Sequence, residues 1–359
     1  MLTSAAAASL VLLLLPSPAR AVATGPGRTA RFNGAADQIA DGQHGPRPRY
    51  MGFYRNSWYE TYARGGSRLA TLANSTSWAN LIISENSSFL VEARRRHAGF
   101  STLLCTKWLL FEQAPGSPPN WLRAVPASSA RQTLESLAPL FHGGTDAPGL
   151  TGLFLGDELM APYTDINSTI DLIRSVLGDS PLLYINQMQI FSGPSGNCKP
   201  LGEDAMSRGW SGAEPCPACW WPAVPAGLDL VGFDMYADGA KEPAAVRSYA
   251  SRCLYPLLSP SQRFVAVPGI FADGSKPLEA QDKLVAQKLA GYSAWLAEDS
   301  RLGGLNPWHY DQRPGIQPSR YELGAADMPL SLAKARSIGE AIVGNTSAIL
   351  ERRSADSVT

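Results

Sequence analysis

The strongest constraint on the fold is a series of eight short apolar runs that alternate with helix-like segments. Each run ends at polar or turn-forming residues, which is typical of a buried β-strand. Buried strands that alternate with helices predict a parallel sheet, because a parallel connection needs a crossover. The expected strands are residues 49–56, 78–84, 100–106, 151–158, 181–186, 228–236, 263–271 and 302–310.

This pattern predicts an α/β protein with one domain, a (β/α)8 TIM barrel over residues 49–343. Such a barrel needs about 250 residues. An open doubly wound sheet is the alternative, but it normally carries a glycine-rich phosphate loop after its first strand. The segment MGFYRNSWYE has no such loop, so we expect no nucleotide cofactor. The expected helices are residues 64–74, 86–98, 128–141, 165–177, 242–254, 277–298 and 328–342.

The N-terminus predicts secretion. Residues 5–15 are apolar but too few to span a bilayer, and Ala19-Arg20-Ala21 fits a small-residue cleavage site. We therefore expect a signal peptide over residues 1–21, a disordered linker over 22–48, and no stable membrane insertion after cleavage. A membrane anchor is the alternative. Residues 344–359 are expected to form a flexible C-terminal tail.

Secretion gives meaning to two other features. Asn-x-Ser/Thr sequons occur at Asn74, Asn86, Asn167 and Asn345, so the protein is expected to be a glycoprotein. In an oxidising compartment the stretch that holds Cys198, Cys216 and Cys219 is expected to carry a disulfide. Cys105 lies in an expected strand, as a buried thiol would. The other cysteine is Cys253.

The charge of the chain excludes one class of partner. Lysine plus arginine and aspartate plus glutamate number 31 each, so the formal net charge is zero. A nucleic-acid surface needs a basic face, and none is indicated. The Cys216-Pro-Ala-Cys219 spacing is half of a zinc site, but no second pair completes it. We expect no metal and no other cofactor.

Two adjacent acids, Asp157 and Glu158, follow the apolar run Leu153-Phe154-Leu155. An ionised carboxylate at the end of a buried strand is costly to desolvate. That cost is accepted at the C-terminal rim of a parallel barrel, where active sites are built. The alternative is that both acids start the next helix, as cap and first-turn residues.

The other strand ends carry amides, aromatic rings and charges. Acids, amides and aromatic rings on one rim suit a carbohydrate site, since carboxylates can protonate a leaving oxygen and stabilise positive charge at the anomeric carbon. Aromatic faces stack on the apolar side of a sugar ring, and polar groups bind its hydroxyls. The candidates are Arg55, Lys107, Trp108, Asn186, Asp234, Tyr236, Trp308 and Tyr310.

Three segments resemble the barrel glycoside hydrolases of the cellulase-like clan. GLFLGDE resembles the clan's fourth strand, LVGFDMY its sixth and GLNPWHYD its eighth. The resemblance implies that Glu158 is the general acid, that Tyr236 orients the second carboxylate and that Trp308 is a stacking platform. GLFLGDE is also similar to the spherulin-like and polygalactosaminidase-like barrels, in which an Asp-Glu strand end is the working pair. That likeness adds Asp157 to the catalytic candidates.

One departure from the clan changes the expected mechanism. The clan's nucleophile is a Glu at the end of strand seven, where this chain has Pro268-Gly269. Asp234 lies on the same strand face as Tyr236 by period-two alternation, so it is our candidate for the second carboxylate.

We therefore expect a secreted glycoside hydrolase that acts on an oligo- or polysaccharide. The first alternative is a barrel that binds glycan without catalysis, since the strand-seven Glu is missing. The second is a metal-dependent hydrolase that uses Asp157, Glu158 and His309. Each candidate also has a structural alternative, namely barrel-mouth packing for Trp308, a backbone-bonded acid for Asp234 and a solvated charge for Lys107.

Overall fold

We analysed a computed structural model of the chain. It describes residues 49–53, 77–115, 122–143, 148–159, 161–188, 223–236, 239–272, 276–308 and 323–356. All of these residues belong to one compact unit, residues 33–359.

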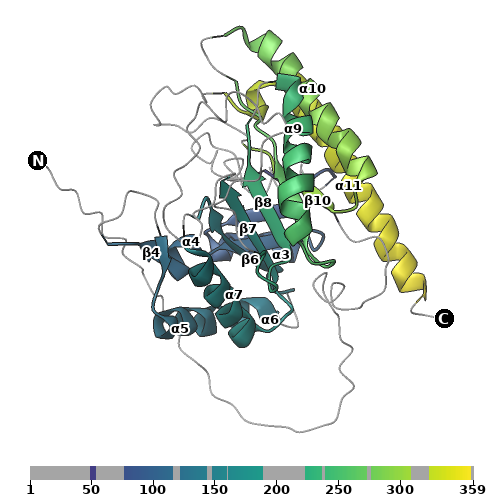
Figure 1. The fold of residues 1–359 in the computed structure, drawn as a ribbon. Helices are drawn as coiled ribbons and strands as arrows, with labels where there is room; N and C mark the ends of the chain where they lie inside the picture. Colours follow the sequence, from purple (N-terminus) through teal and green to yellow (C-terminus); the bar gives the residue numbers. More distant parts are fainter. Residues whose placement is uncertain are drawn as a thin grey trace, which may run out of the picture. The chain divides into compact units, whose positions relative to one another are not determined.

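Eight parallel strands form a single sheet that curls into a nearly closed barrel (Figure 1). Seven strands lie inside the ranges expected for them and β7 continues two residues beyond its range, so the (β/α)8 prediction is confirmed. The order in the sheet is β1-β10-β9-β8-β7-β6-β3-β2. The strands are β1 (Tyr50–Met51), β2 (Leu81–Ser84), β3 (Ser101–Cys105), β6 (Gly152–Asp157), β7 (Leu182–Met188), β8 (Leu230–Asp234), β9 (Arg263–Val267) and β10 (Leu302–Leu305).

The seam between β1 and β2 is closed by one asparagine. The backbone N–H of Asn80 donates to Met51 O at 2.9 Å. Its side-chain Oδ1 accepts from Met51 N at 2.8 Å, and its Nδ2 donates to Arg49 O at 2.8 Å. The Asn80 amide thus takes the place of a strand ladder across this seam.

Replacing Asn80 with Ala is expected to lower the free energy of unfolding by about 1–3 kcal/mol, because it leaves the N–H of the buried Met51 without its partner. Urea unfolding would measure the loss. Ser136→Ala is the control, since the exposed Ser136 hydroxyl donates to Thr133 O within the same helix. Equal unfolding midpoints for the two variants would contradict this account of the seam.

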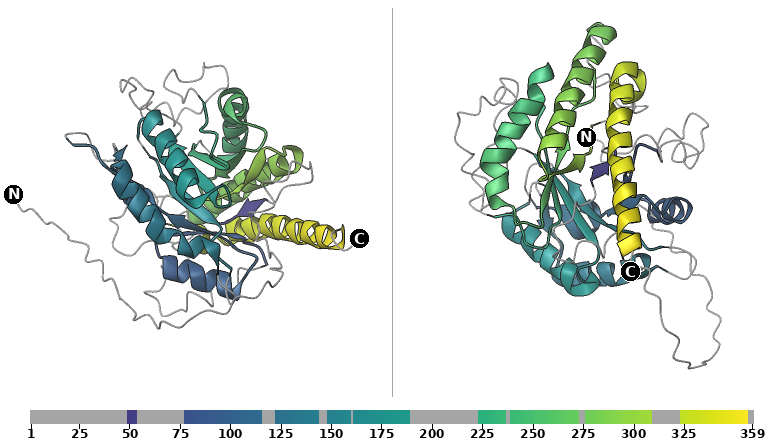
Figure 2. Two further views of the ribbon diagram at one scale, coloured as in Figure 1. Left: turned by 90° about the horizontal axis from the view of Figure 1, so that it is seen from below. Right: turned by 90° about the vertical axis from the view of Figure 1, so that its right-hand side faces the viewer.

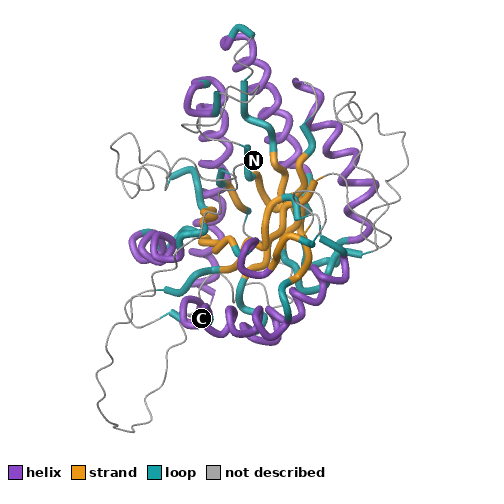
Figure 3. Tube along the Cα trace, turned by 90° about the vertical axis from the view of Figure 1, so that its left-hand side faces the viewer, coloured by secondary structure: helices purple, strands orange, loops and turns teal. Residues whose placement is uncertain are grey.

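Helices surround the barrel (Figures 2 and 3). A short helix, α4, and an antiparallel hairpin, β4–β5, occupy residues 107–124 and were not expected. The helix expected at 128–141 is two helices, because Pro139 begins a second one. The helix expected at 64–74 lies outside the described residues, and α11 continues beyond Ile342. The bounds are α3 (Ser87–Arg96), α4 (Lys107–Leu110), β4 (Phe111–Gln113), β5 (Leu122–Ala124), α5 (Ala127–Leu137), α6 (Pro139–His142), α7 (Tyr163–Leu177), α9 (Glu242–Tyr249), α10 (Leu278–Glu298) and α11 (Pro329–Asp356).

The strands bury side chains on both faces, as period-two alternation requires. One apolar cluster fills the barrel interior and includes Tyr50, Leu103, Phe154, Tyr184 and Val265. The larger cluster lies between the outer sheet face and the helices. Within the described residues, no helix has both the length and the apolar character needed to cross a bilayer.

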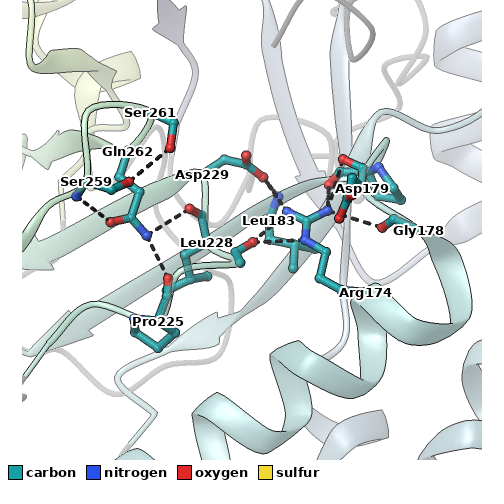
Figure 4. A network of polar contacts seen from close by, with 12 residues as sticks. Arg174, Gly178, Asp179, Leu183, Pro225, Leu228, Asp229, Ser259, Ser261 and Gln262 are labelled. Carbon is teal, nitrogen blue, oxygen red and sulfur yellow. Dashed lines mark hydrogen bonds and ion pairs between the residues drawn. The ribbon is translucent and has the colours of Figure 1, made fainter. Parts of the chain in front are cut away.

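The N-terminal ends of the central strands are tied together by a polar network (Figure 4). Arg174 of α7 donates to the carbonyls of Gly227 at 2.6 Å and Pro181 at 2.7 Å, and it pairs with Asp229 at 2.8 Å. Asp229 also accepts from Leu183 N at 2.7 Å. Burial raises the pKa of Asp229, and Arg174 opposes that shift. These groups satisfy each other's hydrogen bonds at the N-terminal ends of the strands, the end of a (β/α)8 barrel that typically serves stability.

Two of the five cysteines lie in the described part of the chain. Cys105 is a free thiol whose pKa is raised to about 11 by burial, as expected for a core cysteine. Cys253, buried in the π-helical turn 250–254 after α9, is disulfide-bonded. The other three, Cys198, Cys216 and Cys219, lie outside the described residues.

Candidate active site

A β-bulge at the end of β6 places the paired acids. Phe154 pairs with Tyr184, but the next pair is Asp157 with Asn186, so β6 has one more residue than β7 in this interval. Without the extra residue, Gly156 would lie opposite Asn186. The bulge therefore moves Asp157 into register with an inward-facing residue, as bulges near active sites often do. Gly156 permits it with a φ of 150°.

Glu158 follows the bulge in a strained backbone conformation. Its φ of 49° makes it the sole non-glycine residue with positive φ among the residues described. The left-handed region costs a residue with a Cβ about 1–2 kcal/mol. Two hydrogen bonds hold the turn, since Glu158 N donates to Asn186 O at 3.0 Å and Lys107 Nζ donates to Asp157 O at 2.5 Å. Strain held in this way is typical of functional sites.

Asp157, Glu158 and Asp234, which we call the acid triad, meet at the C-terminal mouth of the barrel. One carboxylate oxygen from each acid lies within 4.8 Å of those of the other two. Asp157 and Glu158 are partly exposed, whereas Asp234 is 5% exposed. Asp234, the sequence-based candidate for the second carboxylate, lies close to Glu158 in this cluster.

One buried amide joins two members of the acid triad. Asn186 Nδ2 donates to Asp234 Oδ1 at 2.7 Å and to Asp157 Oδ1 at 3.1 Å. Asn186 itself is fully buried. It therefore holds the two carboxylates in place, and both hydrogen bonds from its amide nitrogen go to the acids.

Asp234 favours its protonated form. Burial raises its pKa well above the usual value, and the nearby charge of Asp157 raises it further. The hydrogen bond from Asn186 lowers the pKa, the charge of Glu158 raises it, and a hydrogen bond from Tyr236 lowers it. The pKa of Tyr236 is itself raised by burial and by Asp234, so its hydroxyl stays a donor. The acid triad thus keeps a proton where a fully ionised cluster would repel itself.

The floor of the site contains three residues that the sequence analysis did not select: Tyr184, Gly232 and Asn306. A Cβ on Gly232 would lie 2.6 Å from Asn186 Oδ1 and 2.7 Å from the Tyr184 hydroxyl. Asn306 Nδ2 donates to that hydroxyl at 3.5 Å. A glycine inside an apolar strand run often marks such a close approach, so Gly232 could have been found from sequence.

The segment after β9, the seventh barrel strand in chain order, has no room for a nucleophilic side chain at Gly269. A Cβ there would lie 2.7 Å from the Phe271 ring and 2.9 Å from the Tyr236 ring. Gly269 forms a parallel bridge with Trp308, whose N–H donates to Pro268 O at 2.9 Å. The rings of Tyr236 and Phe271 contact edge to face at 5.4 Å. This corner of the mouth is therefore apolar and closely packed.

The predicted binding residues fall into three groups. Trp308 is partly buried and packs on the interior cluster. Trp108 is 59% exposed, and the Lys107 ammonium that contacts Asp157 O lies 5.2 Å from the centre of its ring, so this indole stands beside the acid triad. Arg55 and Tyr310, like His309 of the metal alternative, lie outside the described residues.

A divalent cation is the one cofactor that the acid triad could surround, since three carboxylates converge on one point. Exposed acid clusters are common without an ion, and Asp234 favours its protonated form, which a bound cation would oppose. We assign no metal to this site.

Comparisons with known proteins match the fold alone. No protein-family model and no curated protein matches the chain. A solved GH113 β-1,4-mannanase is 12% identical, with 82% of this chain and 99% of that chain covered and a TM-score of 0.44. A GH2 β-galacturonidase from Eisenbergiella tayi is 10% identical, with 82% and 52% covered and a TM-score of 0.49.

A β-glucuronidase from Ruminococcus gnavus is 11% identical, with 80% of this chain covered and a TM-score of 0.45. This chain spans about half the length of the galacturonidase and the glucuronidase, at 52% and 50%. All three of these solved structures are glycoside hydrolases. Sequence identity this low gives no information on activity, so the function is argued from the acid triad.

Proposed function

We propose that this protein hydrolyses O-glycosidic bonds at the acid triad. The observation that carries the proposal is the meeting of a strained, partly exposed Glu158 with a buried Asp234 that favours its protonated form. Glycoside hydrolysis needs one carboxyl group that donates a proton and another that stays charged, and environments that separate their pKa values provide both. The acid triad holds its proton on Asp234 at rest. In this proposal that proton passes to Glu158 when substrate binds, so that Glu158 acts as the general acid and base and Asp234 becomes the charged second carboxylate.

The spacing of the acids supports a mechanism with retention of configuration. An inverting enzyme keeps its two carboxyl groups about 6.5–9.5 Å apart to admit a water molecule, and a retaining one about 5–5.5 Å. One oxygen from each acid lies within 4.8 Å of one oxygen of the others, which is nearer to the spacing of a retaining site. Asp234 remains the second carboxylate of the proposal, and Asp157, held by Asn186, adds negative charge near the anomeric carbon.

Trp108 and Trp308 are the proposed sugar platforms. Trp108 follows β3, next to the acid triad, and Trp308 follows β10, which is four strands away from β6 in the sheet order. A glycan that lies on both rings would cross the acid triad. Lys107 and Asn186 bond to the acids and their backbone, so we assign them a positioning role. Tyr236, Tyr310 and Arg55 remain predicted sugar contacts.

Replacing Trp108 with Ala is expected to weaken glycan affinity by about tenfold, the effect of losing about 1.4 kcal/mol of stacking. Isothermal titration calorimetry with a bound oligosaccharide would measure the change. Leu109→Ala is the matched control, because Leu109 is the exposed neighbour of Trp108 on α4 and has no ring. Equal affinities for the two variants would remove Trp108 from the binding site.

Sugar release from a broad panel of glycans and polysaccharides tests the proposal, with the Glu158→Gln variant as the inactive control. We expect release by the wild-type protein, and a product that keeps the anomeric configuration of the substrate. If glycans bind to both proteins and neither releases sugar, the first alternative holds, a barrel that binds glycan without catalysis. The absence of a carboxylate at Gly269 is the observation that favours that alternative.

We also infer that the protein is secreted. The signal-like N-terminus, the disulfide-bonded Cys253 and the sequon at the exposed Asn86 support this inference. Asn86 caps α3 through Oδ1, which accepts from Phe89 N at 2.9 Å and leaves Nδ2 for a glycan. N-terminal sequencing of protein from the culture medium would identify the cleavage site.

A further inference from the structure

A buried ion pair, which the proposed chemistry does not use, contacts the segment that follows β9. Glu242, the first residue of α9, is fully buried, and Lys288 of α10 is 6% exposed. Glu242 Oε2 lies 2.8 Å from Lys288 Nζ, and the Tyr292 hydroxyl donates to Glu242 Oε1 at 3.1 Å. Burial raises the pKa of Glu242, and Lys288 lowers it. Burying a charge pair costs several kcal/mol of desolvation per ion, so mere packing is a poor reason for it.

The ion pair holds both polar groups of a single residue, Gly269. The Gly269 N–H donates to Glu242 Oε1 at 3.3 Å, and Lys288 Nζ donates to Gly269 O at 2.9 Å. Lys288 also lies 5.9 Å from the centre of the Phe271 ring. The two helix side chains therefore fix the position of the chain just after β9.

Gly269 in turn touches two proposed site residues. The Tyr236 ring lies against its Cα, at a distance where a Cβ would be 2.9 Å from Cδ1. Trp308 pairs with Gly269 by a parallel bridge and accepts a hydrogen bond from Ile270 N. Tyr236 bonds to Asp234. A continuous set of contacts thus joins the ion pair to the second carboxylate and to a sugar platform.

We propose that Glu242, Lys288 and Tyr292 are positioning residues for this site, which hold the Gly269 peptide and through it set Tyr236 and Trp308. The inference rests on the proposed function for its consequence and on the contacts of Gly269 for its structure. Glu242 is not a substitute nucleophile, because its carboxylate is fully buried and bonded on three sides, to Lys288, Tyr292 and Gly269.

The test compares Glu242→Gln with Asp282→Asn. Asp282 is a buried acid on α10, the helix that carries Lys288. It accepts from Leu330 N at 2.9 Å and Ser331 N at 2.8 Å, so it holds the start of α11 instead of the rim. Both variants are expected to lower the melting temperature. Only Glu242→Gln is expected to speed hydrogen exchange at the Gly269 amide, by at least tenfold, and to raise the KM for glycans about tenfold. If Glu242→Gln also weakens the hydrogen bond from Tyr236 to Asp234, the acid limb of the variant's pH–activity profile should move to higher pH, because that hydrogen bond lowers the pKa of Asp234.

The exchange measurement needs no substrate, so the outcomes separate the inference from the proposed function. Unchanged exchange at Gly269 in Glu242→Gln would overturn the inference, whatever the activity. Faster exchange with KM and pH profile both unchanged would also overturn it. If the wild type has no turnover, the proposed function fails, and the glycan dissociation constant replaces KM as the readout. Tyr292→Phe, which removes one hydrogen bond and no charge, is the second variant if Glu242→Gln does not fold.

Discussion

Glu158→Gln is expected to lower turnover by about 10²–10⁴-fold, the usual contribution of a general acid or base, while glycan binding stays within about twofold. The amide has the shape of the acid but cannot donate a proton to the leaving oxygen. The backbone is expected to keep its φ of 49°, because the substitution leaves the hydrogen bonds of Glu158 N and Asp157 O in place. Turnover and affinity are measured on the same glycan, so loss of chemistry is distinguished from loss of binding.

Glu112→Gln is the matched control for this substitution. Glu112 lies on the β4–β5 hairpin that follows α4, and its exposed carboxylate pairs with Arg123 at 2.7 Å. An exposed ion pair contributes about 0–1 kcal/mol, so this variant should keep its turnover and stability. If Glu158→Gln retains turnover comparable to that of Glu112→Gln, the acid role moves away from Glu158.

Asp234→Asn is expected to abolish most turnover and at the same time to stabilise the fold at neutral pH. In the folded protein the pKa of Asp234 is raised, by burial first and then by Asp157. The folded state therefore binds this proton more tightly than the unfolded state does, and its carboxyl group makes the fold less stable as pH rises. The cost begins near the unfolded pKa of about 3.9, increases up to the raised folded pKa, and is constant above it.

The asparagine removes that cost because its amide is neutral at every pH. Melting curves from pH 4 to pH 8 should show equal stability of variant and wild type at the acid end. At neutral pH the variant should melt at least about 2 °C higher, the shift expected for about 1 kcal/mol. Asp171→Asn, on the exposed face of α7, is the control and should give no pH-dependent gain. A gain for Asp234→Asn that is the same at all pH values would mean that packing, and not the proton, causes it.

The helices and strands of the barrel could largely be predicted from the sequence. Alternation of apolar runs with helical segments predicted each of the eight strands, because burial of a strand or helix face imposes a local period on the sequence. The same reasoning did not find the β4–β5 hairpin or the extension of α11 beyond Ile342. The hairpin strands have three residues each, too few to establish a period.

The candidate site divides in the same way. The acids Asp157, Glu158 and Asp234 were visible in sequence, since a charged residue at the end of a buried run conflicts with desolvation. Their protonation states were not visible, because the pKa of Asp234 depends on burial and on neighbours from two other strands. The positioning role proposed for Glu242 could not be predicted from the sequence either, because its contacts with Gly269 and Lys288 join positions far apart in the chain.

The sequence by itself thus determined a parallel barrel and which strand ends bear acids and aromatic rings. The tertiary structure decided the bulge that turns Asp157 inward, the strained φ of Glu158, the Asn80 seam and the support behind Gly269. The periodicity of apolar residues is a local property, which can be read from neighbouring positions in the sequence. Strand register, side-chain burial and the coupling between charges depend on contacts between segments far apart in the chain, so only the tertiary structure determines them.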